Sequence, residues 1–319
     1  MKASTAQQIE SMKKQTIGVE VEMYDITREK AAKIAADFFG TGHYENTADR
    51  NGYYTWSAWD GDGREWKFQR DVSIGARSDS EQTEMVTPIL HYEDIELLQG
   101  LLRSLRRAGA KSNPKHMCGV HIHIGKADHT PKTIRNLANI MASHESLLIA
   151  AMRIDRNRIG RYCQTVDRDF LERLNKEKPR TMARLEDIWY EEQDADSGRH
   201  HHYNQSRYHC LNLHATFTKG TIEFRLFQFA NPTADKKGGL HAGELKSYIQ
   251  LCLALSEMAK EVKTASPKEP QRENPKFAMR TWLMRLGFIG EEFATAREIL
   301  TRNLEGDAAF RFGRNTPLA

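Results

Sequence analysis

The chain of 319 residues lacks the features that mark several large classes of protein. Its four cysteines are spread widely and form no CxxC pair, which argues against a disulfide framework and for a reduced, intracellular protein. No segment approaches the ~20 consecutive apolar residues of a membrane span. The first fifteen residues also lack the apolar core of a signal peptide. We therefore expect a cytoplasmic protein that does not bind membranes.

Two common phosphate-binding motifs are also missing. The sequence contains neither GxxxxGK[ST] nor GxGxxG, so a glycine-rich loop is not expected to hold a phosphate.

The formal net charge is only +4, which neither requires nor excludes nucleic acid as a partner. We do not expect nucleic acid binding, and nothing in the sequence indicates an oligomeric state.

The most informative segment that is present is Thr16–Met23, TIGVEVEM. Apolar and polar residues alternate along it, which predicts a β-strand with one apolar and one polar face. Glu20 and Glu22 share the polar face, where two neighbouring carboxylates repel each other. A solvent-exposed strand tolerates this repulsion, whereas a sheet face that carries more such groups needs cations between them.

Several other predicted strands carry charged or imidazole side chains on one face. These residues are His121 and His123 in CGVHIHIG, Glu223 and Arg225 in TIEFRLFQF, Lys67 and Asp71 in WKFQRDVSI, and Glu84 at the start of EMVTPIL. For any single pair, a solvated strand face explains the pattern. For the whole set, an active-site sheet explains it better.

The order of elements predicts an α+β fold with a mainly antiparallel, curved sheet. Hairpins join neighbouring strands, and helices are inserted between them. We expect one hairpin in YYTWSAWDGDG, turning at Asp60–Gly63, and another in which the strands CLNLHATF and TIEFRLFQF are joined at Lys219–Gly220. The site would lie on the concave face of the sheet, with helices packed on the other face. Helices are expected over 28–39, 91–110, 131–154 and 240–260, where apolar residues recur at helical spacing.

Four segments are expected along the chain. Residues 1–15 are polar and would be frayed, and residues 16–262 would form the catalytic domain. Residues 263–275 read as a linker because of their proline and charge content. Residues 276–319 would form a C-terminal helical extension.

The residue types of the polar face indicate metal chemistry. Hard divalent cations prefer carboxylate oxygens, so a glutamate-rich site with one imidazole fits Mg²⁺ or Mn²⁺ better than structural zinc. Arg225 cannot bind a metal, but its guanidinium can neutralise an anion such as a phosphoryl group in transfer. Metals and a fixed guanidinium suit phosphoryl transfer without a phosphate-binding loop.

Four motifs in this order resemble the amidoligases of the glutamine synthetase / γ-glutamylcysteine ligase superfamily, and above all a divergent amidoligase branch of it. They are GVEVEM, WKFQRDVSI followed by EMVTPIL, GVHIHIG, and LNLHATFTKGTIEFRLF, within residues 16–260. The resemblance implies a glutamine synthetase-like catalytic domain and an ATP-dependent carboxylate–amine ligase. In such enzymes ATP phosphorylates a carboxylate, and an amine then displaces phosphate to form an amide.

The resemblance also implies roles for individual residues. One Mg²⁺ would be bound by Glu20, His121 and Glu223, and a second by Glu22, Glu84 and Asp71. His123 would lie near the phosphates or substrate, and the implied catalytic residues are Arg225, Glu223 and His123. Weaker candidates to bind ATP phosphates or a substrate carboxylate are Lys67, Arg161 and Arg207. The partners implied are ATP, a carboxylate and an amine, with a peptide or protein substrate possible by resemblance alone.

The match is incomplete in two places. Val72 stands after Asp71 where the family pattern has glycine, and Glu81 competes with Glu84 as the metal ligand. We favour Glu84 because it leads directly into the strand VTPIL. The three consecutive histidines 200–202 are interpreted as a loop or lid, since sequence neighbours rarely converge on one metal ion.

Two other functions remain compatible with the same residues. The carboxylates and imidazole could activate water in a metal-dependent phosphohydrolase or nuclease. The chain could also be a non-catalytic relative that binds a nucleotide or peptide. A ligase differs from a hydrolase in needing an amine, and from a binder in turning over ATP.

Overall fold

The computed structural model describes residues 5–50, 52–192, 196–230, 239–270 and 273–312. Its strands form one sheet in the order β2-β3-β4-β5-β1-β6-β8-β7. The strands are β1 Ile17–Met23, β2 Tyr44–Asn46, β3 Trp56–Trp59, β4 Glu65–Gln69, β5 Thr83–Val86, β6 Val120–Gly125, β7 Leu211–Asn212 and β8 Thr221–Phe227. The α+β class and the mainly antiparallel sheet predicted from the sequence are confirmed.

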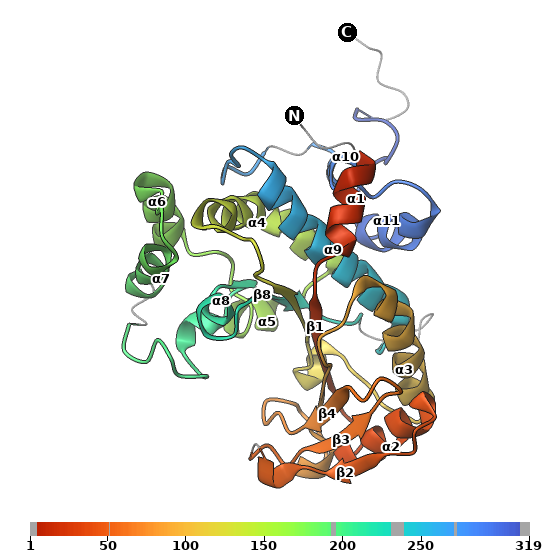
Figure 1. Ribbon diagram of the computed structural model, residues 1–319. Coiled ribbons are helices and arrows are strands. Elements are labelled where there is room, and N and C mark those ends of the chain that lie inside the picture. Colours follow the sequence, from red (N-terminus) through yellow and green to blue (C-terminus); the bar gives the residue numbers. More distant parts are fainter. Residues whose placement is uncertain (1–4, 51, 193–195, 231–238, 271–272, 313–319) are drawn as a thin grey trace. The chain divides into compact units, whose positions relative to one another are not determined.

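The described residues also form eleven α-helices (Figure 1). They are α1 Thr5–Lys13, α2 Arg28–Phe39, α3 Ile95–Arg107, α4 Pro131–Met152, α5 Arg156–Arg161, α6 Arg168–Glu177, α7 Met182–Glu191, α8 His214–Thr218, α9 Ala242–Glu261, α10 Pro275–Arg285 and α11 Ala294–Thr301. The described part of the chain contains no helix that is both long enough and apolar enough to cross a membrane.

The chain divides into two compact units, each made of segments that are distant in sequence. Unit 1 comprises 1–15, 124–224 and 247–319, and unit 2 comprises 16–123 and 225–246. This division reflects spatial packing and cuts the chain at other places than the domain boundaries expected from the sequence, which stay a prediction.

Unit 2 contains β1–β5 and the two helices α2 and α3. Strands β1, β5, β4 and β3 pair successively in antiparallel fashion. Helix α2 begins after Thr27, whose side chain accepts a hydrogen bond from Lys30 N, and ends at Gly40 with φ of 75°. Its buried alanines and Phe39, which contacts the ring of buried Trp66, pack on the apolar face of the sheet. The opposite, polar face is therefore left for other groups.

The predicted hairpin between β3 and β4 is confirmed, with its turn organised by Asp60. Asp60 accepts hydrogen bonds from the backbone of Asp62 and Arg64, and from the side chains of Arg64 and Trp66. Burial acts to raise the pKa of the Asp60 carboxyl, but its hydrogen bonds from Trp66 and Arg64 and the charge of Arg64 hold it below its usual range. Arg64 also pairs with Asp94. The network fixes the register of β4.

Unit 1 contains the helices α4 to α8, α10 and α11, with α1 and most of α9. Residues 1–15 were expected to be frayed, but residues 5–13 form α1 and Met12 is buried; residues 1–4 lie outside the described residues. The cause is a buried polar network: Gln15 donates to Leu253 O and accepts a short hydrogen bond from Ser256, which also bonds His129. This network attaches the end of α1 to α9 and to the start of α4.

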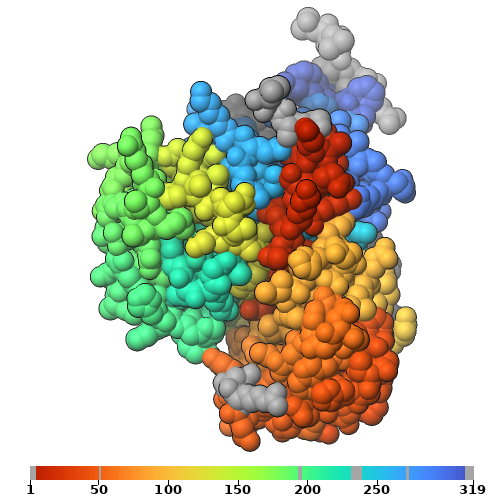
Figure 2. Space-filling view, in the orientation of Figure 1, coloured from red at the N-terminus to blue at the C-terminus, as the bar shows by residue number. Residues whose placement is uncertain are grey.

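The hairpin expected from LNLHATF and TIEFRLF is present only in part. Leu211 and Asn212 pair with Phe224 and Glu223 as an antiparallel ladder, but residues 214–218 form helix α8 rather than strand. His214, Ala215 and Thr216 are consecutive and all buried, which a strand with one solvent-facing side does not allow. On the surface of the same unit lie α6 and α7, in green in Figure 2.

Candidate active site

The polar face of unit 2 carries its charged residues in aligned rows. Glu22 on β1 lies opposite Glu84 on β5, and Glu84 lies opposite Gln69 on β4. Residues that are opposite each other in a sheet point to the same face, so these three side chains form one row. In the next row, Glu20 and Lys67 both lie opposite Val86.

Five residues bring ligand atoms together on this face. The atoms of Glu22, Asp71 and Glu84 lie within 4.8 Å of one another, and so do those of Glu20, Glu84 and His121. We call these five residues the carboxylate cluster. Glu84 belongs to both groups, so two adjacent cation sites would share one carboxylate.

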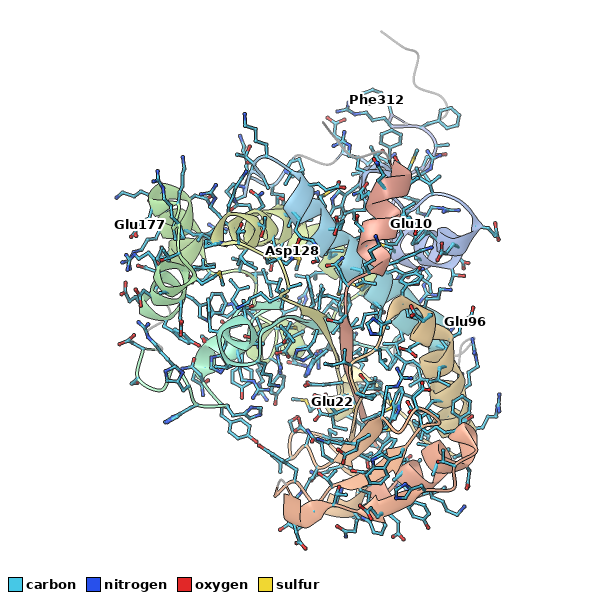
Figure 3. All side chains as sticks on the ribbon, viewed as in Figure 1. Glu10, Glu22, Glu96, Asp128, Glu177 and Phe312 are labelled. Atoms are coloured by element: carbon cyan, nitrogen blue, oxygen red, sulfur yellow. The ribbon has the colours of Figure 1, made fainter. Side chains whose placement is uncertain are left out.

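Glu22 and Glu84 are nearly completely buried, whereas Glu20 and Asp71 are half-buried. Figure 3 shows Glu22 among the side chains of its unit, whereas Glu96 on α3 of the same unit points outward and is exposed. Glu22 Oε2 accepts a hydrogen bond of 2.5 Å from Gly119 N, and the backbones of the two residues also pair. Burial and backbone bonds thus fix the position of this carboxylate.

Asp71 reaches the cluster from a turn and not from a strand, because β4 ends at Gln69. Its Oδ1 accepts a hydrogen bond of 2.7 Å from Ser73 N, as in a turn-capping aspartate. Gln82 holds this turn, since its side-chain amide donates to Ile74 O at 3.0 Å and accepts from Arg70 Nε at 2.9 Å. Asp71 therefore both caps a turn and belongs to the carboxylate cluster.

The two histidines of β6 are buried beside Glu20. His121 Nδ1 lies 2.9 Å from Glu20 Oε2, and His121 Nε2 lies 3.7 Å from Glu22 Oε1. His123 Nε2 lies 3.3 Å from Glu20 Oε1. The strand thus presents two imidazoles to one carboxylate, and only His121 belongs to the carboxylate cluster.

Burial raises the pKa of the Glu84 carboxyl well above its usual value. The negative charges of Glu20, Asp71 and Glu22 raise it further, and the hydrogen bond of 2.8 Å from Gln69 Nε2 lowers it. Four acidic groups that repel one another in a buried place need positive charge for all of them to be ionised. The cluster therefore has the chemistry of a divalent cation site.

The structure also places the competing and weaker candidates. Glu81 lies in the short helical turn Asp79–Glu81 and belongs to neither ligand group. Lys67 is on the polar face, with its side chain 41% exposed and its Nζ 3.6 Å from Glu65. Arg225, on β8 in unit 2, is buried, and Arg161 is exposed at the end of α5.

Glu223 and Arg207 belong to unit 1. Glu223 Oε2 accepts a hydrogen bond of 2.6 Å from Asn212 Nδ2, and both side chains are buried. Arg207 Nη1 donates to His202 O, and its guanidinium lies over the rings of Tyr203 and Tyr208.

Comparison with known sequences places the chain in a family. A model of the family described as "Putative amidoligase enzyme" matches residues 13–256. The chain belongs to this amidoligase family. No curated protein matches the amidoligase sequence. Among solved structures it is similar to a bifunctional glutathione synthetase from Pasteurella multocida, with 13% identity and a TM-score of 0.47. That match covers 94% of this chain but 48% of the other, so the amidoligase spans about half the length of the solved protein.

The sequence analysis missed three polar residues, Gln69 in unit 2 and Asn212 and His214 in unit 1. Gln69 aligns with Glu84, Asn212 binds Glu223, and His214 hydrogen-bonds Tyr190. The alternation along β4 places Gln69 on the face of Lys67 and could have identified it. His214 could not be recognised while its segment was taken for a strand.

The donor set of the amidoligase fits a hard divalent cation. Glu22, Asp71 and Glu84 offer only oxygen, which Mg²⁺ and Mn²⁺ prefer, and the second group adds one imidazole. Among the described residues, no group with four nitrogen or sulfur ligands accompanies them, as structural zinc would require.

Proposed function

We propose that the protein is an ATP-dependent carboxylate–amine ligase that forms an amide bond through an acyl phosphate. The observation that carries this proposal is the sharing of Glu84 between two ligand groups. Paired cations are a known means of stabilising both the entering and the leaving oxygen in phosphoryl transfer. Family membership supports the ligase class, and the chemistry of the polar face supports ATP and Mg²⁺, or Mn²⁺, as cofactors.

The reaction takes place in two steps. In the first, a carboxylate oxygen attacks the γ-phosphorus of ATP, the bond to the bridging oxygen breaks, and ADP leaves with the electron pair. In the second, an amine nitrogen attacks the acyl carbon, and the carbon–oxygen bond to phosphate breaks. Phosphate leaves with that electron pair, and the nitrogen loses one proton to give the neutral amide.

The residues of the chain would share the electrostatic work of these steps. Cations bound by Glu20, Glu22, Asp71, Glu84, His121 and Glu223 would neutralise the phosphate oxygens. Arg225 would stabilise the charge that develops on the phosphoryl group, since a buried guanidinium is a strong and permanent cation. His123 would orient the phosphates or the carboxylate. Lys67, Arg161 and Arg207 would add weaker contacts to phosphate or substrate.

The decisive experiment uses hydroxylamine as a general amine. The full chain is incubated with ATP, Mg²⁺, hydroxylamine and pools of amino acids and peptides, and ADP and hydroxamate are both measured. A ligase gives hydroxamate and ADP in equal amounts, and dividing the pools then identifies the carboxylate. ADP without hydroxamate over all pools would contradict the proposal and indicate a phosphohydrolase.

A further inference from the structure

The residues between β4 and β5 form a loop that carries one of the candidate metal ligands. We call residues 70–82, all of which the structure describes, the Asp71 loop; only its short turn Asp79–Glu81 is helical. Asp71 stands near the start of the loop, and its ligand atom lies within 4.8 Å of those of Glu22 and Glu84. A cation site needs ligands that are held in place, whereas loops are the more mobile parts of a fold. The bonds that hold this loop therefore decide how well Asp71 can serve as a ligand.

Arg28 holds the far end of the Asp71 loop through the backbone of the loop. Its Nη1 donates to Asp79 O at 2.6 Å and to Gln82 O at 3.0 Å, and lies 3.3 Å from Ser80 O. Its Nε donates to Tyr54 O at 2.9 Å. A planar guanidinium directs several N–H groups in fixed directions, whereas the ammonium of a lysine is a single point of charge. The side chain therefore fixes the shape of the backbone at this end of the loop.

The position of Arg28 on its own helix is unfavourable. Arg28 is the first residue of α2, where the partial positive charge of a helix N-terminus disfavours a cation. Its side chain is nevertheless half-buried and directed at carbonyl oxygens of the loop, which carry partial negative charge. The benefit of an arginine at this position comes from the loop and not from the helix.

Gln82 connects the end of the loop to the residues beside the candidate ligand. Its backbone carbonyl accepts the hydrogen bond from Arg28, and its side-chain oxygen accepts one from Arg70 Nε at 2.9 Å. Its side-chain nitrogen donates to Ile74 O at 3.0 Å and lies 3.4 Å from Val72 O. Gln82 thus contacts both chain neighbours of the ligand, and Arg28 fixes the backbone from which this side chain extends.

The middle of the loop has an attachment of its own. Gly75 N donates to His116 O at 2.8 Å, and His116 Nδ1 donates to Gly75 O at 2.5 Å. The His116 ring also stacks on the ring of buried Tyr24, with centroids 3.7 Å apart. Because these contacts do not involve Arg28, we expect the loop to stay attached and the unit to fold when the arginine is replaced.

We propose that Arg28 is a positioning residue for the cation site that contains Asp71. It acts through Gln82 on the backbone at both sides of Asp71, and it is not itself one of the ligands. The other ligand group, with Glu20 and His121, takes no ligand from the loop and should not depend on Arg28. That this cation serves phosphoryl transfer rests on the proposed ligase function, whereas its binding rests on the carboxylate cluster.

Titration calorimetry of the full chain with Mn²⁺ tests this role without catalysis. The wild-type protein should bind two ions. Arg28→Met keeps an unbranched side chain but loses every donor, so it should weaken one of the two sites about tenfold, the lower end of the range for lost supporting contacts around a metal. Arg28→Lys restores the charge and part of the hydrogen bonding, and should recover part of the affinity.

Lys30→Met is the matched control. Lys30 lies in the first turn of the same helix, and its Nζ donates to Ala108 O at 2.9 Å, outside the Asp71 loop. This variant also loses one cation and one bond to a backbone carbonyl, so both Mn²⁺ affinities should equal those of the wild type.

A double-mutant cycle separates positioning from a general loss of stability. Asp71→Asn weakens the site directly, so adding Arg28→Met to it should change Mn²⁺ affinity little. If the arginine only stabilised the unit, its effect would be the same with and without the Asp71 carboxylate.

Three results would overturn the proposal. They are unchanged Mn²⁺ binding in Arg28→Met, an equal loss in Lys30→Met, and an undiminished effect of Arg28→Met in the Asp71→Asn background. Failure of the ligase function gives a different pattern, in which no hydroxamate forms but Arg28→Met still weakens Mn²⁺ binding. A wild-type protein that binds no Mn²⁺ would contradict both the cation sites and the role of Arg28.

Discussion

Two buried carboxylates, one in each unit, have raised pKa values for different reasons. Glu84 in unit 2 is surrounded by Glu20, Glu22 and Asp71, whose charges add to the effect of burial. Glu145 on α4 in unit 1 has no acidic side chain among the causes of its shift. Burial, with a smaller contribution from the Cys163 thiol, raises its pKa to about 7, although Val166 N donates to both of its oxygens at 3.0 and 3.1 Å.

The difference shows why a perturbed pKa does not by itself identify a functional site. Desolvation occurs wherever a polar group fixes a fold, as Glu145 fixes the segment that leads into α6. Mutual repulsion of several acids serves no structural purpose and persists only if something else compensates it. The neighbours of a buried acid therefore carry more information than its pKa.

The largest effect should come from removing the shared carboxylate. Glu84→Gln keeps the shape of the side chain but takes one ligand from both groups, so hydroxamate formation should fall by roughly 10³-fold, equivalent to several kcal/mol of lost charge stabilisation. Added Mg²⁺ should raise the Tm of the wild-type protein and not that of the variant.

Glu96→Gln serves as the matched control, since Glu96 is exposed in the same unit. It should retain both the activity and the Mg²⁺-dependent rise in Tm. A Glu84→Gln variant that keeps wild-type activity would show that the carboxylate cluster is not the catalytic centre.

Glu145→Gln should change stability and not catalysis. The folded-state pKa of about 7 lies above the unfolded value of 4.5, so the folded protein holds a proton that the unfolded chain has lost. The free energy of unfolding should therefore decrease as pH rises from 4.5 to 7, by at most about 3 kcal/mol from this group. Denaturant unfolding at several pH values should show that the variant lacks this component and is the more stable protein above pH 7. An unchanged pH dependence would mean that Glu145 is solvated.

A smaller effect is expected at the residue that supports Glu84. Gln69→Ala removes the hydrogen bond to Glu84 Oε2, and loss of such a supporting partner weakens metal binding by about ten- to a hundredfold. Calorimetric titration with Mn²⁺ measures this affinity. Gln69→Glu should weaken it less than Gln69→Ala or even strengthen it, because it adds a negative charge. Equal affinities in wild type and Gln69→Ala would place the cation away from Glu84.

The smallest effect is expected from Lys67→Met, compared with Glu84→Gln, Glu145→Gln and Gln69→Ala. The side chain is 41% exposed and its Nζ is 3.6 Å from Glu65, so solvent screens its charge. We expect KM for ATP or for the carboxylate to rise less than about tenfold, the scale of a solvent-exposed ion pair. A loss as large as that of Glu84→Gln would mean that Lys67 contacts the phosphoryl group directly.

The sequence predicts the polar face well because strand alternation is a strong constraint. Once a strand has one apolar face, the side of Glu20, Glu22 and His121 is determined, and antiparallel pairing brings Glu84 beside them. Asp71 was placed on a strand, but the structure has it in a turn, because β4 ends two residues earlier.

Other features depend on contacts that no local pattern encodes. The first three residues of helix α8, which begins at His214, are all buried, so packing overrides the strand-like composition of this segment. The sequence alone predicts a frayed segment over residues 1–15, because the hydrogen bonds that hold its end join Gln15 to residues of α9. These partners are 238 and 241 positions away along the chain. Long-range hydrogen bonds of this kind are invisible to any reasoning along the chain.

Glu84 belongs to both ligand groups, which has a consequence for how the site would be filled. The first cation to bind would neutralise part of the acidic charge and occupy the shared Glu84, so the second would bind more weakly. Titration curves would then be shallower than those of independent sites. At limiting Mg²⁺ a population of molecules would consist mainly of singly loaded forms, and full activity would require a higher metal concentration than the first binding event does.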